Sequence, residues 1–596
     1  MANAGARTER LARVAFAALV LATFSAFFVT QRLKHEATVV QGVEMDPYFS
    51  PLGSFHPVEH ISFRIKRSDE VTVTIVAPSG DDIATLVRGR SATAYKRLHL
   101  SWAGRLAGGQ VAPDATYRVR VRLRDQARSL LLVRSFLLHT APPQPSVNVA
   151  GASALSAAIL PAPGGAPAAI SISLAGGRDT QLWVYRTDVS PAVLVRTLPL
   201  AAGATTSSWD GRDAAGNLMP DGSYLVAVRV IDHEGNAGSA PALLPPVAGE
   251  YVPGHAGITV RRLGVEPPYL PVPVGWKIQL GVDARRAPYV WSVTRVGTSR
   301  PQLHGKGHGP LLRFRAPFGN SGAYVLAVRS GGTTVRAPFA VQAAATQHVL
   351  VVLPAITWLG RDTGDDNGSG EPDTLDSGQR VRTARVLAGG LPTGFAARVA
   401  PVLAFLDHRR LHYDITTDLG LAQHSGPHLH GHTGVLLVGD ERWLPATVTE
   451  ALRAFVRGGG RIVSLGIDSL RRPVALSATE LGPAIGPEPT DIFGAHLAPL
   501  ASTPGPITGY LDQIGLFKGG AGLFSGYTTY EATQSVGTRA RLVASAVTAD
   551  GRPVIAAVRY GRGLVIRTGL PELPARLHGD ASATALLARI WELLSQ

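Results

Sequence analysis

Apolar and polar residues alternate along many short segments in the first half of the chain. Tyr117, Val119 and Val121 are separated by arginines, and a period of two residues places the apolar side chains on one face of a strand. Turns rich in Gly, Pro and Asp separate such segments up to residue 342. The pattern therefore predicts several β-sandwich domains in which one face of each strand is buried.

From His348 onward the pattern changes. Residues 349–353 form a continuous apolar run, which predicts a strand buried on both faces. Residues 447–456 combine a capping box with an apolar stripe at helical spacing, and three glycines then end the helix. Further strands are expected at 413–416, 434–438, 461–466, 541–547, 553–560 and 563–568, and further helices at 396–406 and 582–594. The alternation of strands and helices predicts a C-terminal α/β doubly wound domain.

A charge-free apolar run extends from Val14 to Thr30, with arginines before it. Its seventeen residues are at the short end of what spans a bilayer. Bulky Phe24 stands where a small residue would precede cleavage after Ala26, so an N-terminal transmembrane helix is favoured over a cleaved signal peptide. The charges favour a cytoplasmic N-terminus. We therefore expect a single-pass protein of the cell membrane, partnered with the membrane through this helix, with the bulk of the chain extracytoplasmic.

A repeat is the most specific internal pattern. Residues 102–121 (WAGRLAGGQVAPDATYRVRV) align without a gap with residues 209–228 (WDGRDAAGNLMPDGSYLVAV), at an offset of 107. Each copy predicts a strand, a loop of residues that favour turns, and a second strand. The Trp and Tyr side chains that flank each loop are expected in the core, where buried aromatics contribute large contact areas.

This repeat resembles the FlgD Ig-like domain family, for which W-D-G-R-D-x-x-G followed by P-D-G-x-Y is typical. Residues 49–51 (FSP) also resemble the opening of that family. The family consists of interaction and spacer modules, so the resemblance implies no catalysis. The first copy has Ala103, Leu106 and Ala115 where the second has Asp210, Asp213 and Gly222, and we expect its loop to be reshaped.

Composition and charge exclude several kinds of chemistry. The chain has no cysteine, which excludes disulfides, thiolate metal sites and a Cys nucleophile. Its net charge is +15, but the arginines are spread over all segments instead of forming one patch. We therefore expect no binding of nucleic acid.

The C-terminal region resembles the class I glutamine amidotransferase-like fold, and more narrowly the C-terminal domain of the N,N-dimethylformamidase large (beta) subunit family. The resemblance rests on residues 356–358 (ITW), 413–418 (YDITTD), 434–443 (GVLLVGDERW) and 454–461 (AFVRGGGR). It implies a site at the carboxyl ends of parallel strands, where such folds bind their ligands.

The amidotransferase resemblance implies a degenerate catalytic site. The fold places its Cys nucleophile after the strand that here reads IVSLG, and this chain has Asp468 there. A carboxylate cannot replace a thiolate in forming a thioester, although Ser469 next to it is a candidate nucleophile. The fold's His-x-Glu aligns with Leu570, Pro571 and Glu572, so the general base is absent. Because a triad acts as a unit, the loss of two roles predicts no amidotransferase activity.

The dimethylformamidase resemblance implies a mononuclear iron held by tyrosines and a carboxylate. In the motif H-D-E-Y-W this chain has Arg442 at the tyrosine position, and a cation there opposes metal binding. Asp440 and Glu441 remain candidate catalytic and metal-ligating residues for iron or another divalent metal. The alternative is a polar loop paired with Arg442. No other cofactor is expected.

Other clusters are weaker candidates for metal binding. Four histidines of a Gly-rich segment are possible ligands, although loop histidines are the simpler interpretation: His424, His428, His430 and His432. The acidic residues of 362–376 do not match an EF-hand with Gly368 as the turn glycine, so we expect a mobile loop over the site. A Ca²⁺ site in the second repeat would use Asp210, Asp213 and Asp221. A simple turn is the preferred interpretation of these residues.

The patterns together predict five parts. These are a cytoplasmic tip and anchor (1–40), two FlgD-like Ig domains (41–142 and 143–247), a third Ig-like β-sandwich (248–345) and the amidotransferase-like domain (346–596). The first functional hypothesis is a non-catalytic envelope protein that binds a small ligand or an envelope partner protein. The alternative is a metal-dependent amidohydrolase related to the dimethylformamidase large subunit. Fold resemblance alone does not decide between them.

Overall fold

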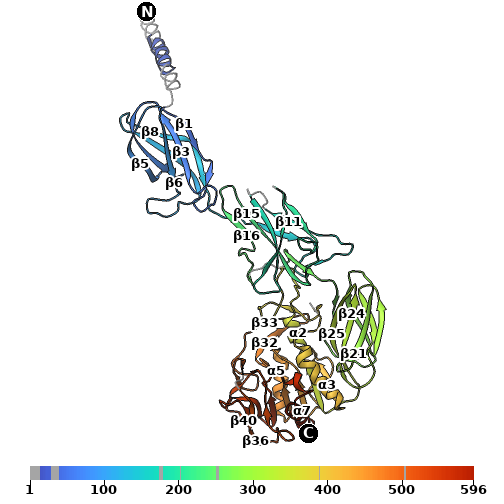
Figure 1. Ribbon diagram of the computed structural model, residues 1–596. Coiled ribbons are helices and arrows are strands. Elements are labelled where there is room, and N and C mark those ends of the chain that lie inside the picture. The colour runs from blue at the N-terminus through green and yellow to red at the C-terminus, as the bar shows by residue number, and fades with distance from the viewer. Residues whose placement is uncertain are drawn as a thin grey trace, which may run out of the picture. The chain divides into compact units, whose positions relative to one another are not determined.

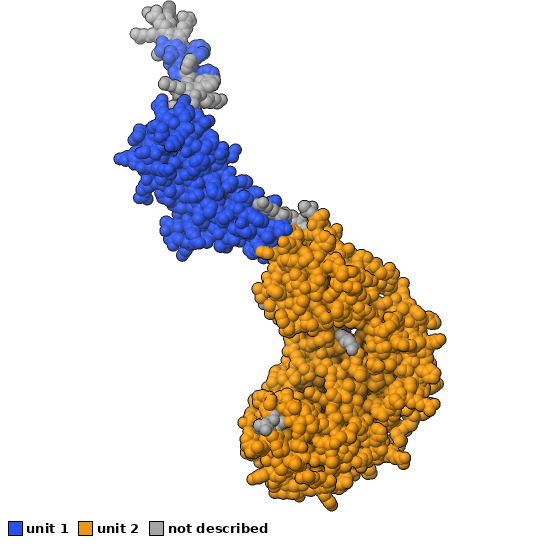
Figure 2. Space-filling model, viewed as in Figure 1, with its two compact units in different colours: residues 1–144, 176–179, 230–238 blue, residues 145–175, 180–229, 239–596 orange. Residues whose placement is uncertain are grey.

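Strands dominate the molecule. The computed structural model describes residues 14–27, 39–173, 179–201, 203–249, 254–387, 390–502 and 505–596. Strands make up 42% of it and helices 13%. The chain divides into two compact units, residues 1–144, 176–179 and 230–238 in one and residues 145–175, 180–229 and 239–596 in the other (Figure 2).

Two sheets pack face to face in the first unit and form a β-sandwich (Figure 1). The orders are β1-β3-β6 and β2-β8-β7-β4-β5. Strand β7 buries Tyr117, Val119 and Val121 and leaves Arg118 and Arg122 exposed, as the alternation predicts. The bounds are β1 (Val40–Met45), β2 (Tyr48–Phe49), β3 (Glu59–Ile65), β4 (Asp69–Val76), β5 (Asp82–Ala92), β6 (Arg97–Trp102), β7 (Ala115–Leu123) and β8 (Arg128–Leu138).

The two copies of the repeat make the same hydrogen bonds. The indole of Trp102 donates to the carbonyl of Arg105 at 2.9 Å, and the indole of Trp209 donates to the carbonyl of Arg212 at 2.9 Å. The hydroxyl of Tyr117 donates to a Pro carbonyl four residues earlier at 2.6 Å, and the equivalent hydroxyl in the second copy does so at 2.7 Å. The repeat in sequence is therefore a repeat in structure.

The expectation that the first loop is reshaped is wrong. In each loop the Arg guanidinium donates to a Gly carbonyl at 2.7 Å, from Arg105 to Gly109 and from Arg212 to Gly216. Each loop also closes with an isolated antiparallel bridge at the Arg. Since indole, guanidinium and backbone set the conformation, the acidic side chains of the second copy are not needed for it.

Further β-sheets follow in the second unit. One sheet has the order β10-β17-β15-β12-β13, with β16 beside β15, and another has the order β14-β11-β9. The bounds are β9 (Ser146–Val149), β10 (Ala158–Leu160), β11 (Ala168–Ser173), β12 (Asp179–Arg186), β13 (Val193–Leu198), β14 (Thr206–Trp209), β15 (Gly222–Ile231), β16 (Ala237–Ala240) and β17 (Gly257–Val260).

A third pair of sheets shares one core, which includes Tyr324 and Phe339. The orders are β18-β20-β23 and β19-β25-β24-β21-β22. Strand β24 begins with Gly322, Ala323 and Tyr324, in the same Gly-x-Tyr order as the start of β15 in the second repeat. The bounds are β18 (Gly264–Val265), β19 (Val272–Pro273), β20 (Lys277–Asp283), β21 (Tyr289–Arg295), β22 (Leu303–Gly307), β23 (Leu311–Arg315), β24 (Gly322–Ser330) and β25 (Thr333–Gln342).

The C-terminal region is built on a nine-stranded sheet of order β28-β26-β29-β31-β42-β41-β40-β36-β37. Its first five strands pair in parallel and the others pair antiparallel. The strands of the sheet are β26 (Val349–Leu353), β28 (Asp414–Thr417), β29 (Gly434–Leu437), β31 (Arg461–Ser464), β36 (Ile507–Asp512), β37 (Leu523–Phe524), β40 (Ala540–Val547), β41 (Pro553–Tyr560) and β42 (Gly563–Arg567).

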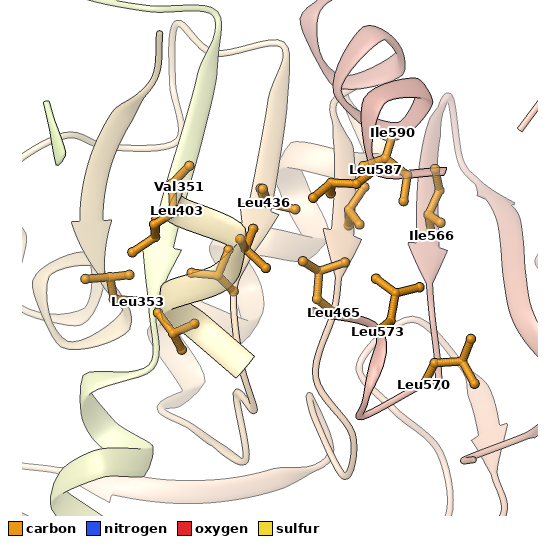
Figure 3. Packing of buried hydrophobic residues seen from close by; sticks show 14 of the residues in the cluster. Val351, Leu353, Leu403, Leu436, Leu465, Ile566, Leu570, Leu573, Leu587 and Ile590 are labelled. Atoms are coloured by element: carbon orange, nitrogen blue, oxygen red, sulfur yellow. The ribbon is translucent and has the colours of Figure 1, made fainter. Parts of the chain in front are cut away.

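Helices and small sheets surround this large sheet. Leu587 and Ile590 of α7 pack in one core with Leu436 and Ile566 of the sheet (Figure 3). The helices are α2 (Ala355–Arg361), the π-helical turn η1 (Phe395–Val399), α3 (Ala400–His408), α4 (Asp418–Ala422), α5 (Ala446–Arg457), α6 (Leu573–Arg576) and α7 (Ala581–Ser595). The small sheets contain β27 (Val381–Arg382), β30 (Trp443–Leu444), β32 (Arg472–Leu476), β33 (Glu480–Ala484), β34 (Ala495–Leu497), β35 (Ala501–Ser502), β38 (Thr529–Tyr530) and β39 (Thr533–Val536).

The prediction of a doubly wound α/β domain is wrong. Such a fold needs a helical crossover between successive parallel strands. Here the connection from β31 to β42 contains only strands and loops among the described residues, and the far side of the sheet is antiparallel. The predicted capping box also fails, because α5 begins after Pro445 without a side-chain cap.

The prediction of a transmembrane anchor is wrong as well. Residues 14–27 are helical, and the predicted run continues to Thr30 outside the described residues. Among the described residues, every helix is too short or too polar to span a membrane. The predictions of a membrane partner and of a single-pass, extracytoplasmic location depended on this anchor, and they are wrong for the same reason.

Candidate functional site

Several acidic side chains meet where the parallel strands of the large sheet end. Asp418 begins α4 directly after β28, Asp440 and Glu441 follow β29, and Asp468 follows β31. The carboxyl ends of parallel strands lie at one edge of a sheet, which is the usual position of ligand sites in such arrangements. We call this set of residues, together with their partners below, the acidic edge.

Asp418 and Glu441 form a buried pair. Each side chain is only 1% exposed. The Oδ1 atom of Asp418 accepts the N–H groups of Ile356 at 3.0 Å and Leu419 at 2.7 Å. Among the described residues, no other group donates a hydrogen bond to the carboxylate of Glu441 or to the Oδ2 atom of Asp418, and the two carboxyls lie within hydrogen-bond reach of each other. A buried charge without partners is costly, so at least one of the two carboxyls holds a proton.

The proton affinities of this pair follow from its burial. Burial raises the pKa of Asp418 to about 7. Burial, followed by the charge of Asp418, raises the pKa of Glu441 well above its ordinary value. Because the two groups titrate together, the values belong to the pair. Near neutral pH the pair is therefore partly protonated.

Asp440 lies beside a small cavity. Its carboxylate pairs with Arg398, and its Oδ1 atom accepts the N–H of Ile467 at 3.0 Å. The cavity has a volume of about 220 Å³ and is also lined by Thr357 and Trp358. A space of this size holds a small molecule, with a cation, a carboxylate and an indole on its walls.

Asp468 is held by three arginines. Its carboxylate pairs with Arg442, with Arg471 at 2.7 Å and with Arg472 at 2.8 Å. Burial alone would raise the pKa of this carboxyl, but the hydrogen bond of Arg472 and the charge of Arg442 lower it below the ordinary value. Its backbone has a φ of +47°, the left-handed conformation of a tight elbow. Asp468 therefore stays ionised, and its carboxylate oxygens are engaged by the three arginines.

Ser469 is fully buried and shows no activation. Its hydroxyl donates to the carbonyl of Ile467 at 3.0 Å and accepts the N–H of Glu441 at 3.1 Å. A serine nucleophile needs a base that accepts its proton. Because this proton goes to a carbonyl, the hydroxyl acts as a structural bridge between two strand ends.

Glu572 does not contact the acidic-edge residues described above and has partners of its own. Its carboxylate accepts the N–H of Thr528 at 3.2 Å and pairs with Arg576 at 3.5 Å. Glu531, which the sequence patterns did not indicate, occupies the acidic edge instead. Its carboxylate accepts the N–H of Asp468 at 2.9 Å, and burial raises its pKa to about 7. Glu531 follows the short strand β38, and no local pattern in the sequence marks it.

The four candidate histidines are not gathered into one group of ligands in the described part of the chain. The Nε2 atom of His432 lies 3.0 Å from Asp414 Oδ2, and the rings of His424 and His428 are 6.1 Å apart. Within the described residues, none of the four belongs to a group of three or more close ligand atoms. The carboxylates of the second repeat are also used elsewhere, since Asp221 pairs with Arg262 at 2.5 Å.

The acidic loop 362–376 is built into the fold and is not a free lid. Asp365 is 7% exposed, and its carboxylate accepts the N–H groups of Gly368 at 2.7 Å and Gly370 at 2.8 Å. Arg385, which is 3% exposed, donates to backbone carbonyls on both sides of the loop. The loop reaches the acidic edge through Asp376, which pairs with Arg442 at 2.7 Å.

The residues at the acidic edge do not fit the iron that the dimethylformamidase resemblance implies. The tyrosine position is Arg442, whose guanidinium binds Asp376 and Asp468. Asp440 is neutralised by Arg398. A cation at one expected ligand position, and a second cation paired with Asp440, oppose a metal ion.

One family model and several solved structures are similar to the chain. Residues 313–483, less than a third of the chain, match the family model "N,N-dimethylformamidase beta subunit-like, C-terminal". No curated protein matches. A β-galactosidase from Bacillus circulans sp. alkalophilus is 16% identical with a TM-score of 0.23, over 33% of this chain and 26% of its own.

Two further solved structures are similar at the same low level. The exo-β-1,4-mannosidase Op5Man5 from Opitutaceae bacterium strain TAV5 is 14% identical with a TM-score of 0.23, over 41% of this chain and 36% of its own. Fibronectin(III)-like modules of Clostridium thermocellum CbhA are 12% identical with a TM-score of 0.17, over 37% of this chain and 93% of their own. The chain thus spans about a quarter of the β-galactosidase and about a third of the mannosidase. Likenesses of this size carry no argument about function.

Proposed function

We propose that residues 346–596 form a non-catalytic binding domain for a small polar ligand, carried behind β-sandwich modules at 41–142, 143–247 and 248–345. The observation that carries this proposal is the state of Asp468, the residue at which the amidotransferase resemblance implies a nucleophile. Three arginines hold it, so it attacks no substrate. The match of residues 313–483 supports descent from a domain of the dimethylformamidase type whose chemistry has been lost.

The cavity beside Asp440 is the proposed ligand site. Arg398 supplies hydrogen-bond donors, Asp440 and Thr357 supply acceptors, and Trp358 supplies an apolar wall. A small amide or carboxylate meets this combination, because its oxygen accepts from a guanidinium and its carbon atoms stack on an indole. The sandwich modules resemble interaction and spacer modules, and we propose that they play that part here.

The second candidate function is amide hydrolysis. The family match and the raised pKa of the buried pair at the acidic edge favour it, because a carboxyl that is protonated near neutral pH is a candidate acid. Amide hydrolysis is the weaker candidate, because a catalytic acid must reach its substrate and Glu441 is only 1% exposed.

The two functions separate in one experiment on the full chain. N,N-dimethylformamide and acetate are titrated by calorimetry, and released dimethylamine and bound iron are measured in parallel. We expect binding without turnover, and binding weakened at least tenfold by Arg398→Ala, which removes the guanidinium from the cavity wall. Glu572→Gln is the matched control, because that carboxylate lies in a different partner set.

Release of dimethylamine that Asp440→Asn abolishes would establish the hydrolase instead. Binding of neither probe, or binding that Arg398→Ala leaves unchanged, would contradict the cavity as the ligand site.

A further inference from the structure

Three possible metal ligands converge in the first unit, far in sequence from the acidic edge. His139 follows the last strand of the first sandwich, β8, and Asp232 and Glu234 lie in the turn after β15. One ring nitrogen of His139 and one carboxylate oxygen from each acid lie within 4.8 Å of one another. All three residues are partly buried, so the group lies at the surface of a packed region.

One buried amide positions two of these residues. The side-chain N–H₂ of Asn236 donates to the carbonyl of His139 at 3.0 Å and to the carboxylate of Asp232 at 2.9 Å. Its oxygen accepts the hydroxyl of Ser50 at 2.6 Å. Asn236 is 4% exposed and Ser50 is fully buried, so this junction is shielded from water. A buried, fully satisfied amide fixes the geometry of the groups that it joins.

Close backbone contacts hold the turn 232–236 in place. The N–H of Ser54 donates to the carbonyl of Gly235 at 3.0 Å. A Cβ atom on Gly235 would lie 2.4 Å from the same N–H, and a Cβ atom on Gly53 would lie 2.2 Å from the carbonyl oxygen of Glu234. Only glycine permits these approaches. The turn therefore cannot shift without losing them, and Glu234 is held near His139.

The free lone pairs of the group suit a metal ion. Among the described residues, no hydrogen bond or ion pair engages the ring of His139 or the carboxylate of Glu234. Two carboxylates and a neutral imidazole carry two negative charges, which a divalent cation balances. A set of one nitrogen and two oxygen ligands fits Zn²⁺ and its first-row neighbours, whereas Ca²⁺ and Mg²⁺ take oxygen ligands.

We propose that His139, Asp232 and Glu234 bind one divalent transition-metal ion of the Zn²⁺ class, which fastens the turn 232–236 to the first sandwich. Three protein ligands leave a fourth position for water. The bound ion stabilises the folded state, because the ligands converge only when the turn is docked. This site is independent of the acidic edge and of the proposed ligand.

The test uses the full chain, freed of metal with a chelator and titrated with Zn²⁺ by calorimetry. We expect one Zn²⁺ per chain at this site and a thermal midpoint that rises with Zn²⁺. His139→Ala and Glu234→Gln should each weaken this binding at least about tenfold and remove the thermal shift. Glu234→Gln keeps the size of the side chain, so it tests ligation in a chain that folds as before.

His428→Ala is the matched control, because it removes a histidine from the segment that carries four of them. It should leave the Zn²⁺ affinity of the site unchanged. Loss of binding in His428→Ala, unchanged binding in Glu234→Gln, or equal affinity for Ca²⁺ would each overturn the proposal.

Discussion

The buried pair at the acidic edge makes stability depend on pH in a specific direction. Burial places the pKa of Asp418 at about 7, against an ordinary 3.8. The folded state therefore binds more protons than the unfolded state between those values, and stability falls as pH rises through this window. Below the unfolded pKa the contribution of the pair is fully present, and above the folded pKa it is lost.

Glu441→Gln removes one of the two acids without changing the volume of the side chain. Burial, followed by the charge of Asp418, raises the pKa of Glu441 well above its ordinary value, so ionisation of this acid costs folding stability at alkaline pH. The Gln amide donates a hydrogen bond to Asp418 at every pH, whereas the Glu441 carboxyl can do so only while it holds a proton. We expect the variant to be more stable than the native chain by about 1 to 3 kcal/mol at pH 8. At pH 5 the gain should be clearly smaller, because the native acids hold their protons and pH 5 is only slightly above the ordinary carboxyl pKa of the unfolded state.

The assay is urea unfolding of the full chain at pH 5 and pH 8, followed by tryptophan fluorescence. Trp443 is 1% exposed and lies two residues from the substitution, so it reports on this core. Glu572→Gln is the control, since hydrogen bonds to Thr528 lower the pKa of Glu572 and its loss should not stabilise the chain at pH 8. A Glu441→Gln gain of equal size at both pH values, or no gain at pH 8, would refute the reasoning.

Three other substitutions test the packing and the repeated turn. Leu465→Ala, at a site 2% exposed in the largest core, should lower the free energy of unfolding by about 2 to 5 kcal/mol in urea titrations, and a loss below 1 kcal/mol would contradict the described packing. Gly466→Ala would place a Cβ atom 2.0 Å from the carbonyl oxygen of Gly439, and the backbone cannot yield cheaply, so we expect a loss of at least about 3 kcal/mol or no folded C-terminal region by circular dichroism. Tyr224→Phe removes the hydroxyl that donates to Pro220 and should cost about 1 kcal/mol in thermal unfolding, with an unchanged midpoint speaking against that bond.

The positions of strands and helices follow well from local patterns. The apolar run 349–353 is β26, and the helix expected at 447–456 is α5 with one more residue at each end. Pairing does not follow from such patterns, because it depends on contacts between distant segments. The sequence between β31 and β42 contains only strands and loops among the described residues, and no local signal distinguished that connection from a helical crossover.

For the candidate site, the location of the residues could be predicted from the sequence, but their ionisation and pairing could not. Asp440, Glu441, Asp468 and Ser469 follow strands whose order along the chain is readable, and the structure brings them to one edge of the sheet. Their ionisation and pairing were not readable, because burial and partners distant in sequence decide them, such as Arg398 for Asp440 and Arg442 for Asp468. The roles assigned to these residues stay predictions until binding and turnover are measured.

The repeated turn separates the residues that specify a fold from those that face the surroundings. Trp, Arg, Gly and Tyr make the same bonds in both copies, while the neighbouring positions carry Ala103 and Leu106 in one and Asp210 and Asp213 in the other. The exposed rim of each turn therefore differs in charge and size while the bonds beneath it stay the same. The two copies therefore present surfaces of different chemistry on the same backbone structure. Substitutions at these surface positions can change which partner is bound without a change in the fold.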